Sequence, residues 1–300
     1  MLINKPGYIK NNLLLLGDKS VCMYLLKGDE YLLIGGGMSY IIPTIEAQFD
    51  EFKIDRSKIM GLLVLHSHFD HAGAVTYFSK AYPKMEIFGS KGVEKIFGME
   101  KAVKITAQLD RASRQRFGVA DQFNKISLEL ENPYLTKVLT EGDNLDLGNE
   151  IIVSMYDTPG HSKCSMMAYV ADQKYLFPSD GAPLPVLADN NFIVMANDNL
   201  PIYLKTLERI GKLNTRGGVI CFEHGGAFIG EDADTYMQKA IELTRSQYEF
   251  YRQELEKGAD PDELVKTGIS EIMADGTFNL ITEEILTQVF TSMVLSVKNE

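Results

Sequence analysis

The segment IMGLLVLHSHFDH, residues 59–71, decides the fold class of this chain. Its first half is a nearly continuous apolar run, which is typical of a β-strand buried on both faces. The run leads directly into His66, and His68 follows two residues later, so strand spacing places both imidazoles on the same face. Asp70 and His71 lie in the turn that follows, and they can reach the same space from a second direction.

The remaining histidines extend this pattern. The chain has five histidines in all, and the other two, His161 and His224, each follow a predicted strand and lie beside glycine residues. Strand ends are where layered α/β proteins place their functional sites. Packed together without a cation, the histidines and the aspartate of the first segment would repel one another or compete for partners. We therefore expect a metal centre that collects side chains from several strand ends.

A seventh candidate ligand is Asp180, which also ends a predicted strand. A carboxylate can bridge two cations about 3.5–4 Å apart, and a water shared by such a pair loses its proton near neutral pH. We expect two divalent ions per chain. Imidazole and carboxylate donors suit zinc, iron or manganese, and the absence of cysteine argues against a structural zinc site built on thiolates. A metal-activated water makes a serine nucleophile unnecessary, so we expect Ser67 and Ser162 to make turn or supporting hydrogen bonds.

Composition limits the class of protein and its partners. The 300 residues are 45% hydrophobic and 24% charged, which is ordinary globular usage. The net charge of −11 argues against broad binding to nucleic acid or to an anionic membrane surface, and no segment is apolar enough to span a bilayer. The three cysteines are widely spaced, which favours a reducing cytoplasm over a disulfide framework. We expect Cys164 and Cys221, each three residues from a histidine, to be buried packing residues.

Alternating strand and helix patterns predict an α/β layered architecture. The stretch 100–135 has helical composition, and we interpret it as a helical insertion between strands. From 231 to 300 the pattern is almost entirely helical, with a start signal at Asp260-Pro261 and a cap at Thr282 for the last helix. We expect a catalytic domain over 1–230 and a helical C-terminal extension over 231–300 that covers the site.

The insertion also carries basic residues. Arg111, Arg114 and Arg116, accompanied by Lys101 and Lys104, could bind an anionic substrate such as the phosphates of coenzyme A. The simpler interpretation is an exposed, solvated helix face, and we favour it.

Taken together, the His-x-His-x-Asp-His run at 66–71, the Gly-His-Ser at 160–162, the strand-terminal Asp180 and the late His224 resemble the metallo-β-lactamase-fold superfamily. The similarity covers roughly residues 10–230. It implies a four-layer αββα sandwich in which one metal is bound by His66, His68 and His161, the other by Asp70, His71 and His224, with Asp180 bridging. The sequence departs from the superfamily at 34–37, where Ile-Gly-Gly-Gly replaces the acidic residue that usually ends an early strand. A second, smaller departure is Ser179, which stands where glycine is common.

In general layout, the chain is similar to the subgroup that contains the quinolone-signal-response protein, a 2-aminobenzoylacetyl-CoA thioesterase. This similarity implies hydrolysis of a carboxylic ester-type bond in a small-molecule substrate. A thioester of the acyl-CoA kind is favoured, and Asp70 serves as both ligand and catalytic residue. Lactones, glutathione thioesters and phosphodiesters are alternatives at the same site. An oxygen-reducing iron enzyme is disfavoured, because such relatives usually carry an acidic residue at the position of His68. A different class of function is a regulatory protein with little turnover, for which the C-terminal helices could support a homodimer.

Overall fold

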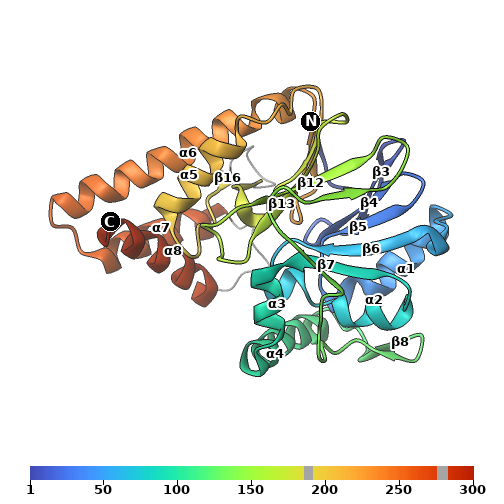
Figure 1. Ribbon diagram of the computed structural model, residues 1–300. Coiled ribbons are helices and arrows are strands. Elements are labelled where there is room, and N and C mark those ends of the chain that lie inside the picture. Colours follow the sequence, from blue (N-terminus) through green and yellow to red (C-terminus); the bar gives the residue numbers. More distant parts are fainter. Residues whose placement is uncertain (186–191, 276–282) are drawn as a thin grey trace.

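The computed structural model describes residues 1–185, 192–275 and 283–300 and contains two seven-stranded sheets (Figure 1). The first sheet has the strand order β10 (Lys137–Leu139), β7 (Glu86–Ser90), β6 (Ile59–Val64), β5 (Tyr31–Ile34), β4 (Cys22–Lys27), β3 (Leu13–Gly17) and β2 (Gly7–Lys10). The second has the order β1 (Leu2–Ile3), β18 (Ala227–Ile229), β17 (Val219–Cys221), β14 (Tyr175–Phe177), β13 (Met166–Val170), β12 (Ile152–Asp157) and β11 (Asn144–Asp146). Two small hairpins are formed by β8 (Gln122–Phe123) with β9 (Ile126–Ser127) and by β15 (Leu184–Pro185) with β16 (Phe192–Ile193).

The two sheets pack face to face, as the division of the buried residues shows. In β3, Leu13 and Leu15 join the apolar cluster between the sheets, whereas Leu14 and Leu16 join the cluster beneath the helices of the first sheet. All four leucines are fully buried, because a strand in an inner layer is covered on both faces. A third cluster lies between the second sheet and its own helices.

Helices cover the outer face of each sheet and complete an αββα sandwich, which confirms the predicted fold class. Those packed on the first sheet are α1 (Ile42–Glu51), α2 (Val75–Ala81) and α3 (Lys91–Phe97). Those packed on the second sheet are α5 (Leu200–Ile210) and α6 (Glu231–Glu256). The predicted insertion contains α4 (Glu100–Arg116) followed by the hairpin β8–β9.

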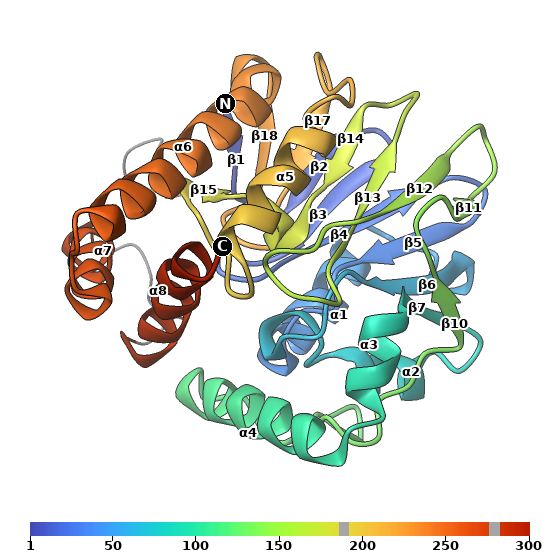
Figure 2. The ribbon, with the colours of Figure 1, turned by 60° about the vertical axis from the view of Figure 1, so that its left-hand side comes forward.

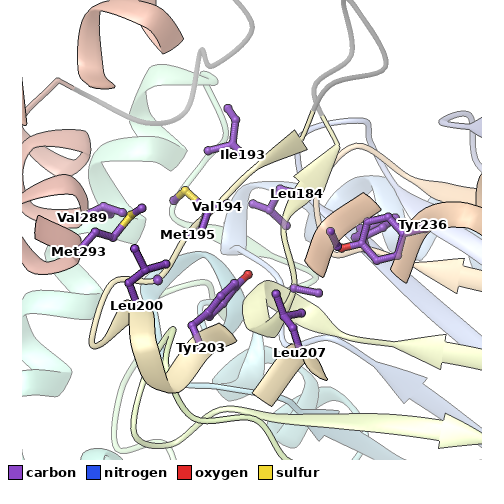
Figure 3. Packing of buried hydrophobic residues seen from close by; sticks show 14 of the residues in the cluster. Leu184, Ile193, Val194, Met195, Leu200, Tyr203, Leu207, Tyr236, Val289 and Met293 are labelled. Atoms are coloured by element: carbon purple, nitrogen blue, oxygen red, sulfur yellow. The ribbon is translucent and has the colours of Figure 1, made fainter. Parts of the chain in front are cut away.

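The C-terminal segment is helical, as predicted, and it shares a core with the second sheet. After α6 come α7 (Pro261–Asp275), whose first residue is the expected proline, and α8 (Glu283–Lys298). Val289 and Met293 of α8 pack with Leu200 and Tyr203 of α5 (Figure 3). Both Figures 1 and 2 show α7 and α8 beyond the end of the sandwich, on the side where α6 leads away from the sheets. The predicted cap Thr282 lies outside the described residues.

Two further observations concern membrane-spanning helices and the cysteines. Within the ranges described, we find no helix that combines the length and the apolar character needed to cross a bilayer. Cys22, Cys164 and Cys221 are buried and unpaired, in agreement with the packing role expected for the last two.

Candidate metal centre

The loop that carries the first four candidate ligands is fixed by glycine residues. It follows β6 and lies against the turn after β5, where Gly37 O accepts a hydrogen bond from Gly73 N (2.8 Å) and Gly36 O accepts one from Ala74 N (3.1 Å). A Cβ atom at position 36 would lie 2.1 Å from the carbonyl oxygen of His71. The glycine at 36 therefore permits the close approach that brings this loop to the strand ends.

Three imidazoles form the first group of possible ligands. His66, His68 and His161 each offer a nitrogen, and these atoms all lie within 4.8 Å of one another. Nε2 of His161 is 3.0 Å from Nδ1 of His68. Nε2 of His66 is buried and has no hydrogen-bond partner.

The second group contains Asp70, His71 and His224, again within 4.8 Å. Nε2 of His224 lies 3.0 Å from Nε2 of His71. Oδ2 of Asp70 is 3.4 Å from Nε2 of His224 and 3.5 Å from Nε2 of His71. The resemblance to the superfamily implied these two groups, and the fold brings the members of each one together.

Asp180 lies between the two groups. It is held in the short 3-10 helix η4 (Ser179–Gly181) that follows β14. Its Oδ2 is 3.3 Å from Nε2 of His71, in the second group, and 3.5 Å from Nε2 of His161, in the first. Its Oδ1 is buried without a hydrogen-bond partner. A carboxylate in this position can face a cation on either side.

The outer nitrogen of four imidazoles lies close to an oxygen atom of the protein, and the other nitrogen is turned toward the centre. His161 Nδ1 lies 2.5 Å from the carbonyl oxygen of Met195, and His224 Nδ1 lies 2.6 Å from that of Ser20. His66 Nδ1 is 3.1 Å from Ser179 Oγ. His71 Nδ1 is 3.1 Å from a carboxylate oxygen of Glu223. Such outer contacts fix the tautomer and the ring orientation of metal-binding histidines.

Burial and charge set the protonation states of these groups. Burial lowers the pKa of His66 and His161 and lowers that of His68 to about 4, so all three imidazoles are neutral at pH 7. Burial alone would lower the pKa of His71. The negative charges of the neighbouring carboxylates have the larger combined effect and raise its pKa, namely those of Asp180, Glu223 and Asp70. Although burial favours the neutral acid, the neighbouring His71 holds the pKa of Asp70 and Asp180 below the ordinary value.

These observations fit divalent cations. Buried ligand atoms without hydrogen-bond partners and ionised carboxylates are costly when enclosed together, and a cation in each group would relieve that cost. The donor set contains only nitrogen and oxygen, which suits zinc, iron or manganese.

Comparison with known proteins gives the family. The model of the metallo-beta-lactamase superfamily matches residues 16–217, more than half of the chain. The chain belongs to the metallo-beta-lactamase superfamily. Members of this superfamily are mostly metal-dependent hydrolases that bind divalent metals such as zinc or iron, and the resemblance seen in the sequence motifs is confirmed at this level.

Solved structures show the same fold. A beta-lactamase domain protein from Burkholderia ambifaria is 16% identical with a TM-score of 0.69, covering 98% of this chain and 87% of its own. A metallo-beta-lactamase family protein from Thermus thermophilus is also 16% identical, with a TM-score of 0.65 and coverage of 97% and 95%. The rubredoxin oxygen:oxidoreductase from Desulfovibrio gigas is 17% identical with a TM-score of 0.56, covering 95% and 75%. At these identities the similarity concerns the fold alone.

Sequence reasoning missed one residue that the fold places beside these candidate ligands. Glu223, directly before His224, is buried at 2% exposure. Its Oε2 faces Nδ1 of His71 and accepts a hydrogen bond from Ser179 Oγ. A Cβ atom at Gly35 would lie 2.7 Å from Oε1 of Glu223. Gly35 belongs to the segment 34–37, which lacks the acidic residue that is usual in the superfamily, and the carboxylate of Glu223 lies beside that segment. Its place at a strand end beside a histidine was the available signal.

A cavity of about 830 Å³ opens onto the site. Five of the seven candidate ligands line it, namely His68, Asp70, His161, Asp180 and His224. Its walls come from α3 and α4 on one side and from α8 on another, so the C-terminal extension does contribute to the surroundings of the site. Cys164 also lines this cavity, and its Sγ contacts Ser67 Oγ at 3.3 Å, in keeping with a supporting role for that serine.

The basic residues of the insertion do not line this cavity. Arg114 is 1% exposed and its guanidinium contacts Asp110, Asp121 and Glu129. Arg111 pairs with the same Glu129. Arg116, Lys101 and Lys104 are exposed. The expectation of a solvated face fails for Arg114, because that side chain turns into the fold and finds buried partners.

Proposed function

We propose that this chain is a dinuclear metal hydrolase that cleaves a carboxylic ester-type bond, with a thioester of the acyl-CoA kind as the favoured substrate. His66, His68 and His161 would hold one ion and Asp70, His71 and His224 the other, with Asp180 between them. The position of Asp180, within 3.5 Å of both groups, is the single observation that carries the proposal. When bound, zinc or iron ions (manganese is also compatible) would supply a water that is activated near neutral pH and a Lewis acid for the carbonyl oxygen.

Asp70 is the residue we assign to catalysis. Both Asp70 and Asp180 line the cavity, but the side chain of Asp70 is 20% exposed and that of Asp180 only 6%, so Asp70 is the more accessible carboxylate. Oδ2 faces His71 and His224, which leaves Oδ1 to orient a water and to accept its proton. His66 and His71 are fully buried, so they would hold the metal ions without contacting the substrate.

The cavity supports an enzyme over a regulatory protein with little turnover, because ligands of both groups are accessible from it. Lys19, Lys95 and Lys163 line it as well, although the chain as a whole carries a net charge of −11. Lys163 is 3.8 Å from Asp198, and Lys19 and Lys95 are exposed. Local cations of this kind can attract the anionic part of a substrate such as an acyl-CoA. Unpaired cysteines support a reducing compartment, and we place the reaction in the cytoplasm.

The test is hydrolysis by protein purified without added metal and then loaded with zinc or iron. Acyl-CoA, acyl-glutathione, lactone and bis-p-nitrophenyl phosphate substrates are compared for wild type, Asp70→Asn and Asp180→Asn. We expect acyl-CoA to give the largest kcat/KM and each substitution to lower it by roughly 100-fold or more, the usual worth of a positioned acid–base group. Asp172→Asn, in an exposed turn, is the matched control. Equal activity of Asp70→Asn and wild type would refute the proposal, and a preference for another substrate would correct the thioester assignment.

A further inference from the structure

Helix α4 buries charged side chains and exposes apolar ones, which is the reverse of a usual surface helix. The face turned into the fold carries Asp110 and Arg114, each 1% exposed and 3.3 Å apart between Oδ2 and Nη1. Asp110 accepts hydrogen bonds from the backbone nitrogen and the hydroxyl of Ser39, which anchors α4 to the first sheet side of the sandwich. Of the three buried residues of α4 only Ala107 is apolar, so polar contacts contribute most of its anchoring, whereas a surface helix ordinarily buries its apolar stripe.

The apolar residues of α4 point the other way. Met99 at its N-cap and Ile105 and Leu109 within it are 46%, 48% and 41% exposed, and all three line the cavity over the metal centre. They belong to a row of cavity-lining residues that begins near the end of α3 and continues along α4, namely Ile96, Met99, Ala102, Ile105, Thr106 and Leu109. We call this row the α4 stripe. Its part on α4, from Ala102 to Leu109, is roughly 10 Å long at 1.5 Å per residue.

Helix α8 forms the facing wall (Figure 2). Ile285, Gln288 and Val289 line the cavity, again at a spacing of three and four residues. The other face of α8 is buried in the core of the second sheet through Leu286, Phe290 and Met293. The cavity is therefore an apolar passage between two helices that are anchored independently, one by ion pairs and one by apolar packing.

We propose that the α4 stripe binds the apolar acyl chain of the substrate, with the carbonyl end at the metal centre. This inference rests on the proposed function and adds the substrate class, a medium- or long-chain acyl compound. An exposed apolar row that folding does not require indicates a ligand, and this one is continuous with the site where cleavage would occur. The lysines that line the same cavity would meet the anionic end of the molecule.

Equilibrium binding of straight-chain 1-alkanols with four to ten carbons tests this inference apart from turnover, because these probes carry no anion that could bind a metal. We expect calorimetric titration of the metal-loaded protein to show affinity rising up to three- to fourfold per methylene, the value for a fully buried CH2. Ile105→Asp and Leu109→Asp should weaken decanol binding at least tenfold. Leu295→Asp, a 39% exposed leucine of α8 outside the cavity lining, should bind like wild type.

Each outcome separates the possibilities. Affinity that does not change with chain length overturns the inference, even if short thioesters are hydrolysed. Chain-length dependence without hydrolysis of any thioester upholds the binding of an apolar chain by the α4 stripe and refutes the thioester assignment of the proposed function. A second copy of the chain is the other possible occupant of the α4 stripe. Sedimentation that shows a wild-type dimer converted to monomer by Ile105→Asp, together with absent alkanol binding, would assign the stripe to that interface instead.

Discussion

At the scale of single residues, the order of side chains around the centre follows from strand geometry. His66 and His68 are two residues apart at a strand end, and the fold does place them in one group, as period-two spacing predicts. Glu223 could not be recognised in this way, because its function depends on His71 and Ser179, which only the folded chain brings to it. One carboxylate thus orients His71 directly and His66 through Ser179, so it connects the two groups.

This connection gives a prediction for Glu223→Gln. We expect roughly 10- to 100-fold weaker metal binding, since outer partners of ligating histidines usually contribute that much. Competition against a chromophoric chelator measures the affinity without reference to activity. Glu46→Gln is the matched control, because Glu46 of α1 is also buried but accepts hydrogen bonds from Tyr77 and Tyr82. Unchanged affinity in Glu223→Gln would show that the carboxylate does not position the ligands.

At the scale of elements, α4 is a helix whose existence the sequence pattern predicted but whose buried face it did not. Its composition correctly predicted a helix in the insertion, but basic side chains there suggested a solvated face. The orientation of Arg114 depends on Ser39, 75 residues away, and on Glu129 beyond the helix. No periodicity within the helix contains those partners. The helix was predictable, and the face that it buries was not.

Arg114→Met should therefore be destabilising. We expect a loss of about 3–5 kcal/mol in the free energy of unfolding, the usual cost of leaving a buried charge without its partner. Arg116→Met, on the exposed end of the same helix, should change it by less than about 0.5 kcal/mol. Denaturant titrations of the two variants give both values, and equal losses would contradict the buried role of Arg114.

The pH dependence of that loss is a separate expectation. Burial raises the pKa of Asp110 to about 6, although Ser39 and Arg114 favour its charged form. A carboxyl whose folded pKa lies above its unfolded pKa contributes stability at low pH, and that contribution is lost as the pH rises through the folded value. Without Arg114 the folded pKa should rise further. The deficit of Arg114→Met should thus be smaller at pH 5 than at pH 8, and a deficit that is larger at pH 5 would contradict this assignment.

At the scale of the whole molecule, the centre joins the two sheets. The 66–71 loop follows β6 of the first sheet, whereas His161, Asp180 and His224 follow β12, β14 and β17 of the second. The sequence predicted strands and their terminal side chains, but strand order and the division into two sheets depend on long-range pairing, such as β14 with β17, that no local pattern contains. The contribution of α8 to the cavity likewise required the fold.

Metal removal should consequently lower the thermal stability of the whole sandwich, because the cations would link ligands from one sheet to ligands from the other. Ligand present at a thousand times its Kd stabilises a protein by about 4 kcal/mol, so we expect a chelator to lower the Tm by roughly 5–10 °C. Differential scanning calorimetry of wild type before and after chelation measures the shift, and re-addition of zinc or iron should reverse it. Asp180→Asn, deprived of the carboxylate between the groups, should respond much less to the chelator. A wild-type Tm that is indifferent to chelation would mean that the seven side chains are held together by the protein alone.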